Sequence, residues 1–202
     1  MTIVRADSGS LLSYSIAKSP SATILRALAV ALVAALTAAA AQISAPLPFT
    51  AVPLTLTPMI VLLGGAALGS RLGAAAQVTY LLAGIAGLPV FAPSVTLPPG
   101  AARLLGPTGG YLMAYPIAAF VTGWLAERGW DRRYWTSVVA MLAGLTLIFA
   151  GGVSWLSIAF THSLTTAAAQ GLVPFIPIDL VKVGIAALIL PQTWRVVGRN
   201  RP

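Results

Sequence analysis

The stretch PFIPIDLVKVGI, residues 174–185, places one aspartate and one lysine inside an otherwise apolar segment. Asp179 and Lys182 are three residues apart, so on a helix both side chains project from the same face. A charged side chain at membrane depth costs roughly 2.5–3.5 kcal/mol on insertion scales, so each of these two needs a partner or a ligand. A mutually neutralising pair that only stabilises helix packing is one interpretation of the pattern. We favour the other, in which the pair binds a substrate.

Composition indicates that the whole chain is a membrane protein. Hydrophobic residues make up 58% of the 202 residues, charged residues make up 8%, and the mean hydropathy is +0.91. A water-soluble domain of this size would not stay in solution with that composition. The sequence contains no cysteine, which excludes disulfides, thiolate metal sites and cysteine nucleophiles. We interpret the net charge of +8 through its distribution along the chain, and not as a sign of nucleic-acid binding.

Windows of about 17–25 apolar residues predict six transmembrane helices. Glycine- and proline-rich breaks separate windows near residues 24–45, 54–70, 72–90, 108–126, 135–160 and 177–195. The expected fold class is therefore an all-α integral membrane protein with a single domain. It divides into an N-terminal cytoplasmic segment (1–23), the six-helix domain (24–195) and a basic cytoplasmic tail (196–202). The first window is too long for a cleaved signal peptide and lacks an obvious stop, so we expect it to be retained.

The basic residues predict the orientation of these helices. They precede the first helix and follow the second, fourth and sixth: Arg5, Lys18, Arg26, Arg71, Arg128, Arg132, Arg133, Arg195, Arg199 and Arg201. With an even number of helices all of them fall on one side, which the positive-inside rule makes cytoplasmic. We therefore expect both termini in the cytoplasm.

The opposite side of the membrane carries almost no charge, and Arg103 is the one cation in its loops. We expect the loops at residues 45–57, 91–108 and 161–176 to converge there on the outer end of the last helix, where Asp179 lies. Two cations and one carboxylate leave a net charge of +1, which matches a small molecule with one negative charge. An ionised aspartate also suits paired N–H donors, because it only accepts hydrogen bonds. Aromatic residues are available to line such a pocket, although each could instead anchor the protein at the interface: Phe49, Phe91, Tyr111, Tyr115, Trp155 and Phe175.

Four stretches of the chain resemble a known family. They are PLPFTAVPLTLTPMIVLLGGAALGSRLG (46–73), LAGIAGLPVFA (82–92), LLGPTGGYLMAYPIAAFVTGWLAER (104–128) and PFIPIDLVK (174–182). In this order they are similar to the BioY family, the biotin-specific S components of energy-coupling factor (ECF) transporters, and the similarity runs from about residue 25 to residue 190. The resemblance implies an S-component-like bundle of six helices in the bacterial cytoplasmic (inner) membrane. It also implies capture of biotin on the outer face and delivery inward, with biotin as transported ligand and no cofactor.

The resemblance also implies which residues bind the ligand. Asp179 would accept from the ureido N–H groups, while Lys182 and Arg103 share the ureido oxygen and the carboxylate in an order that stays open. The chemistry of the GPTGGY stretch itself adds two candidates: its glycines permit close approach, and Thr108 and Tyr111 could add hydrogen bonds to the ligand. Some relatives carry a small polar or glycine-rich loop after the Pro-Val-Phe stretch. This chain has Ala92, Pro93 and Ser94 there, so a side-chain amide contact from that loop is absent and Ser94 is only a weak substitute for it. The expected substrate-binding set is completed by Phe91, Ser94 and Trp155.

A stripe of small residues marks the first helix. Ala27, Ala31, Ala35 and Ala39 recur every four residues, a pattern that lets helices approach closely in lipid. In the resembled family such a stripe faces the transmembrane T component, which in turn links to two ABC-type ATPases. Packing within the protein itself is the alternative. The Lys-Ser/Thr pair of a phosphate-binding P-loop is missing from the GPTGGY stretch, so we expect ATP hydrolysis in the partners and no enzyme activity here.

Three alternatives compete with biotin capture. An S component for another small anionic vitamin would share the fold and differ in its pocket. A proton-coupled secondary carrier could titrate Asp179, although no inverted repeat is detectable. An intramembrane hydrolase could combine His162 with Ser154 or Ser157, but neither a G-x-S-x-G nor an H-E-x-x-H motif accompanies them.

Overall fold

The computed structural model describes residues 9–12, 21–94 and 97–199, with side chains described up to residue 195. Three of the basic residues used to predict orientation, Arg5, Lys18 and Arg201, lie outside the described residues, as does the side chain of Arg199. Most of the proposed N-terminal segment 1–23 and the end of the tail 196–202 are outside them too. The fold below is that of the described part.

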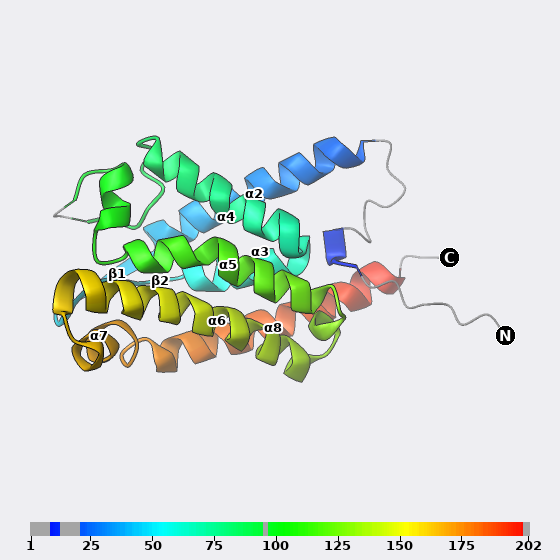
Figure 1. Ribbon diagram of the computed structural model, residues 1–202. Coiled ribbons are helices and arrows are strands. Elements are labelled where there is room, and N and C mark those ends of the chain that lie inside the picture. The colour runs from blue at the N-terminus through cyan, green and yellow to red at the C-terminus, as the bar shows by residue number, and fades with distance from the viewer. Residues whose placement is uncertain (1–8, 13–20, 95–96, 200–202) are drawn as a thin grey trace.

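The chain forms long helices joined by short irregular elements (Figure 1). Two 3₁₀ turns, η1 and η2, precede α5 and α6, and a π-helical turn, η3, continues α6. The elements in chain order are α2 (Ala22–Gln42), β1 (Ser44–Leu47), β2 (Thr50–Thr55), α3 (Thr57–Leu68), α4 (Ser70–Ile85), η1 (Ala101–Leu105), α5 (Gly109–Ala126), η2 (Trp130–Arg132), α6 (Tyr134–Leu156), η3 (Ser157–Thr161), α7 (Leu164–Gly171) and α8 (Ile176–Arg199).

Each of the six predicted windows overlaps one helix of the structure: α2, α3, α4, α5, α6 with η3, and α8. By length and composition, three helices of the described chain could each cross a membrane: Ala22–Gln42, Tyr134–Thr161 and Ile176–Arg195. The helix Thr57–Leu68 is apolar but shorter. α8 continues to Arg199, so the residues just beyond 195 extend the last helix.

The prediction of an all-α fold is wrong between α2 and α3, where the chain forms a β-hairpin. β1 and β2 are antiparallel, with Ser44 opposite Thr55 and Leu47 opposite Thr50, and the register shifts between Ala45 and Leu47. Prolines at 46, 48 and 53 prevent a helix here, but a two-stranded sheet has only edge strands and tolerates proline at edges and bulges. The β-branched residues of TAVPLT favour the extended conformation.

The helices pack side by side with α5 in the middle, in contact with α3, α4 and α6 (Figure 1). α2 packs on α3 and α4, and α8 packs on α3 and α6. α5 lies very close to the α3–α4 junction, because a Cβ added at Gly123 would lie 2.5 Å from the carbonyl carbon of Gly69. At this junction Glu127 accepts hydrogen bonds from the Ser70 amide (2.8 Å) and hydroxyl (3.0 Å), and so caps the start of α4.

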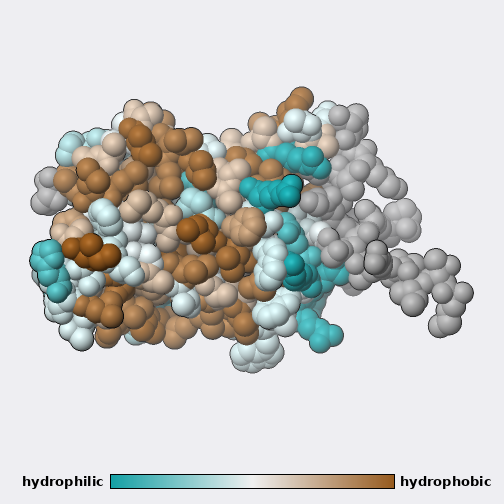
Figure 2. Space-filling model, viewed as in Figure 1, coloured by the Kyte–Doolittle hydropathy of each residue, from teal (hydrophilic) through white to brown (hydrophobic). Residues whose placement is uncertain are grey.

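The two ends of the bundle differ in chemistry. α2 begins and α8 finishes at one end, whereas the hairpin and α7 lie at the other (Figure 1). Hydrophobic side chains cover the visible flank, and hydrophilic ones gather towards the end where α8 finishes (Figure 2). Exposed arginines at or next to the helix ends on that side are Arg71, Arg128, Arg132 and Arg133. A broad apolar flank is the surface expected of a protein surrounded by lipid.

Candidate functional site

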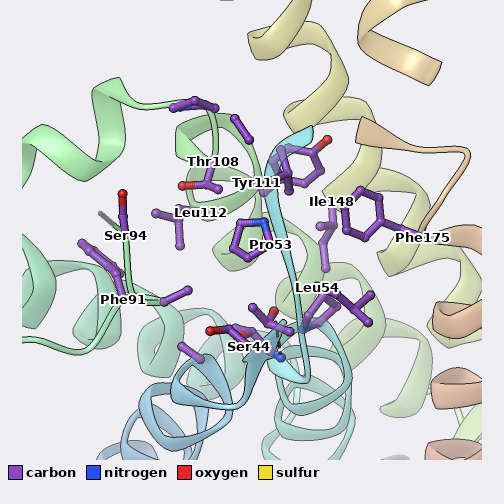
Figure 3. Close-up of a pocket in the computed structure, with 18 of the residues that line it drawn as sticks. Ser44, Pro53, Leu54, Phe91, Ser94, Thr108, Tyr111, Leu112, Ile148 and Phe175 are labelled. Atoms are coloured by element: carbon purple, nitrogen blue, oxygen red, sulfur yellow. Dashed lines mark hydrogen bonds between the residues drawn. The ribbon is translucent and has the colours of Figure 1, made fainter. Parts of the chain in front are cut away.

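A cavity of about 480 Å³ lies at the hairpin end of the bundle. It is enclosed by the hairpin, the start of α5, the start of α8 and the segment after α4 (Figure 3). The lining is mostly apolar and the volume is within the range usual for small-molecule sites. Apolar residues that point towards it include Pro53, Leu54, Phe91, Leu112, Ile148 and Phe175.

Two of the three charged residues in the lining form an ion pair on α8. The Lys182 ammonium donates to Asp179 Oδ1 at 2.7 Å, and the two residues are only 7% and 4% exposed. This confirms the prediction that their i, i+3 spacing places them together. Lys182 also donates to the Thr55 carbonyl at 2.6 Å. The ion pair therefore connects α8 to the end of the hairpin as well as carrying charge into the cavity.

Arg103, on η1, is the third charged residue in the lining and is 9% exposed. One terminal N–H donates to the Ala92 carbonyl at 2.8 Å, while Nε is buried and has no hydrogen-bond partner among the described residues. Burial lowers the pKa of this guanidinium, and its interaction with the Tyr80 phenol opposes that shift. A buried cation with an unused donor is suited to an anionic ligand.

Most of the residues predicted for the site line the cavity. Phe91, Ser94, Thr108 and Tyr111 do so together with the three charged residues. The Tyr111 hydroxyl donates to the Gly171 carbonyl at 2.7 Å, which means that this tyrosine presents its ring to the cavity while its proton is used on α7. Tyr115 and Phe175, expected as aromatic lining, are also present there.

Trp155 and Phe49 do not line the cavity. The Trp155 indole N–H donates to the Gly106 carbonyl at 2.9 Å, so this side chain fixes the turn before α5. Phe49 lies in the turn of the hairpin and is 57% exposed. The sequence predicted both residues as lining, but the Trp155 side chain is bonded to Gly106 and the Phe49 side chain is exposed.

Sequence reasoning missed two features of the cavity. It placed the segment at residues 45–57 near Asp179, but it did not predict that this segment is a hairpin whose Thr55 carbonyl accepts from Lys182 and whose Val52 and Leu54 line the cavity. A backbone acceptor has no sequence signature. The second is Tyr80, which lies in the middle of the apolar helix α4, is 1% exposed, and stacks edge-on against Phe91 with ring centroids 5.4 Å apart.

The three residues proposed for an alternative hydrolase site, His162, Ser154 and Ser157, are not among the residues that line the cavity. His162 follows η3 in a left-handed conformation (φ 50°), Ser154 is on the last turn of α6, and Ser157 begins η3. In the part of the chain that is described, no group of three His, Cys, Asp or Glu side chains could hold a metal ion.

The small-residue stripe is on the outer face of α2. Ala27, Ala31, Ala35 and Ala39 are all exposed, whereas the buried face of the helix is formed by other residues, among them Val33 and Thr37. The stripe is therefore not used for packing against any described part of this chain.

A second buried carboxylate lies at the opposite end of the bundle. Asp131, on η2, is 1% exposed and accepts a hydrogen bond from the Trp194 indole at 2.6 Å. Burial raises the pKa of this carboxyl, and the hydrogen bond from Trp194 opposes the shift. Because α8 carries Trp194, this contact joins the far end of α8 to the connection between α5 and α6.

Comparison with known proteins gives consistent matches over most of the chain. The model of the BioY family matches residues 15–199. The chain is 41% identical to a biotin transporter BioY of Thermotoga maritima over 143 residues, which covers 71% of this chain and 81% of that protein. It is also 41% identical to a probable biotin transporter BioY of Pyrococcus horikoshii over 160 residues, which covers 79% of this chain and 90% of that protein.

A solved structure has the same fold. The crystal structure of the S-component for biotin from an ECF-type ABC transporter superposes with a TM-score of 0.78 and is 25% identical in sequence. The match covers 88% of this chain and 94% of that one.

The contact between Lys182 and Thr55 predicts that the hairpin depends on α8. In Lys182→Met both hydrogen bonds of the ammonium are lost, so amide hydrogen exchange in β2 should become about tenfold faster, as expected for one or two net hydrogen bonds. The measurement is exchange in purified protein, followed by mass spectrometry of peptides covering residues 50–57.

Lys182→Met has two effects: it removes the hydrogen bond to Thr55, and it leaves Asp179 as an unpaired buried carboxylate. The variant Asp179→Asn/Lys182→Met separates them. It removes the unpaired carboxylate, so a recovery of global stability with exchange still fast in β2 supports the Thr55 contact. Wild-type exchange rates in Lys182→Met would contradict it.

Proposed function

The chain belongs to the BioY family, and on that premise we propose that it binds biotin and brings it into the cell as the substrate-binding S component of an ECF transporter. The observation that supports this most directly is the distribution of charge in the cavity. A carboxylate and an ammonium lie together on α8, and a guanidinium with an unused N–H lies on η1, in an otherwise apolar lining.

The chemistry of biotin matches this distribution. Its ureido ring offers two N–H donors, and an ionised Asp179 can accept them because a carboxylate has about four acceptor positions and Lys182 uses one. Its bicyclic body is apolar, as are Leu112 and Ile148 in the lining. Its carboxylate can take the buried Nε–H of Arg103. The charges of the lining sum to +1 (two cations and one anion), which a singly charged anion neutralises.

The proposed orientation places the cavity on the outer face of the membrane. In this arrangement α2, α3, α4, α5, α6 and α8 span the bilayer and both termini are cytoplasmic. The start of α2, the end of α8 and the exposed arginines Arg71, Arg128, Arg132 and Arg133 gather at the end opposite the cavity, which supports this orientation. The location would be the cytoplasmic membrane of a bacterium.

The proposed partners are a transmembrane T component and two ABC-type ATPases, with no cofactor bound to this chain. The exposed alanine stripe of α2 supports contact with a helical partner, because small side chains let two helices approach closely in lipid. Energy for uptake would come from the ATPases, and this chain would contribute ligand binding.

Binding of labelled biotin to the purified protein without ATP tests the proposal. We expect a stoichiometric complex with the wild type, and about 30-fold to several-thousandfold weaker binding in Asp179→Asn, since losing one partner of a buried charge pair costs about 2–5 kcal/mol. Gel filtration and thermal unfolding check that the variant is folded. Wild-type affinity in Asp179→Asn would refute the role of this residue, and a complex formed only with another anionic vitamin would replace biotin as the ligand.

A ligand series tests whether Arg103 binds the carboxylate. Arg103→Ala should weaken binding of biotin more than binding of biotin amide, because the amide has already lost the charged contact. Dissociation constants of both ligands are measured for wild type and variant. Equal losses would assign the carboxylate to Lys182 or to another group.

Substitution of the alanine stripe tests the partner surface. Ala31→Leu/Ala35→Leu should hold a partner helix away from α2 while biotin binding survives, because the cavity is lined by other residues. Co-purification with the T component and ATP-driven uptake are measured on the same preparation as biotin binding. Ala150→Leu, an exposed position on α6, is the matched control. Loss of biotin binding together with assembly would contradict this assignment.

A further inference from the structure

The segment after α4, residues 89–92, forms part of the cavity wall and is held from two sides. Phe91 and Ala92 both line the cavity. Arg103 donates to the Ala92 carbonyl at 2.8 Å. From the other side, the Gln42 side-chain amide donates to the carbonyls of Pro89 at 3.1 Å and of Phe91 at 3.2 Å. We call residues 89–92 the Phe91 segment.

The Phe91 side chain is packed against α4, so the segment cannot move without losing this contact. The ring is 6% exposed and meets Tyr80 edge-on, with an interplanar angle of 85°. It lies directly over Gly84, where an added Cβ would collide with the ring. The position of the side chain is therefore set by α4, but two of the backbone carbonyls are satisfied by a residue of α2.

Gln42 is the last residue of α2, the helix that carries the exposed alanine stripe. Its contacts with the Phe91 segment span 47 and 49 residues of sequence. The adjacent Ala41 lines the cavity and the next element, β1, contributes Ser44 to the lining. The C-terminal end of α2 is thus attached to two parts of the cavity wall. It continues covalently into β1, and it is hydrogen-bonded to the Phe91 segment through Gln42.

We propose that Gln42 is a positioning residue for the ligand: its amide holds the Phe91 segment against the cavity and couples a displacement of α2 to ligand release. This inference rests on the proposed function. Without the amide, the two carbonyls face solvent at the exposed end of the helix and the segment opens more often. In this proposal the ligand leaves when the Phe91 segment opens, so the change should fall on the dissociation rate rather than on the association rate.

The coupling follows from linkage. If a partner bound to the stripe shifts α2 and so changes the Gln42 contacts, it changes the ligand affinity, and the ligand changes the affinity for the partner by the same factor. Removing the amide should reduce both effects, because α2 then loses its hydrogen bonds to the Phe91 segment.

The first experiment measures the dissociation rate of labelled biotin from the purified full-length protein. Gln42→Met keeps the length of the side chain and removes both donors, so dissociation should become about tenfold faster with association changed less than threefold. Gln42→Glu places acceptors against the two carbonyls and should dissociate at least as fast. Gln192→Met, an exposed glutamine on α8, is the matched control and should keep the wild-type rate.

The second experiment compares the same rates with and without the assembled T component. The partner should change the wild-type rate, and the ratio with and without it should approach one in Gln42→Met. Failure of the wild type to bind biotin would overturn the proposed function itself. If it binds, a dissociation rate in Gln42→Met within twofold of wild type overturns the positioning role, and a ratio that is one in the wild type, or equal in both proteins, overturns the coupling.

Discussion

The burial of Lys182 is the constraint on which the site depends. An ammonium that is 7% exposed must have its N–H groups satisfied, and the chain does so with Asp179 on the same helix and the Thr55 carbonyl at the end of β2. Breaking such a buried pair costs about 3–5 kcal/mol. The hairpin is consequently tied to α8 at the point where the cavity is enclosed, and the same charge that closes the wall is available to a ligand.

The irregular backbone in and around the cavity wall is held by side chains that bind its carbonyls. Arg103 holds Ala92, Gln42 holds Pro89 and Phe91, Trp155 holds Gly106, and Tyr111 holds Gly171. Irregular backbone near a membrane needs such partners, because its polar groups have no ladder or helix to satisfy them. In this protein the satisfying side chains come from helices α2, α5 and α6 and from η1, so the loops are positioned by the bundle.

Much of the fold and many of the side chains that line the cavity could be predicted from the sequence. The apolar windows located the long helices, because length and hydropathy are local properties of the chain. The i, i+3 spacing of Asp179 and Lys182 predicted their contact for the same reason. The hairpin was missed because its prolines were interpreted as loop residues, and Trp155 was misplaced because its direction depends on the turn at Gly106.

The sequence by itself determined the class of protein, the helices and the presence of a paired charge in the last of them, since composition, periodicity and spacing act within one helix. Tertiary structure alone decided which groups complete the pair and the cavity. Thr55, Tyr80 and Gln42 meet their partners across 127, 11 and 49 residues of sequence. Contacts of this kind depend on how α2, α4, α8 and the hairpin pack, and that packing is a property of the folded chain that no single segment specifies.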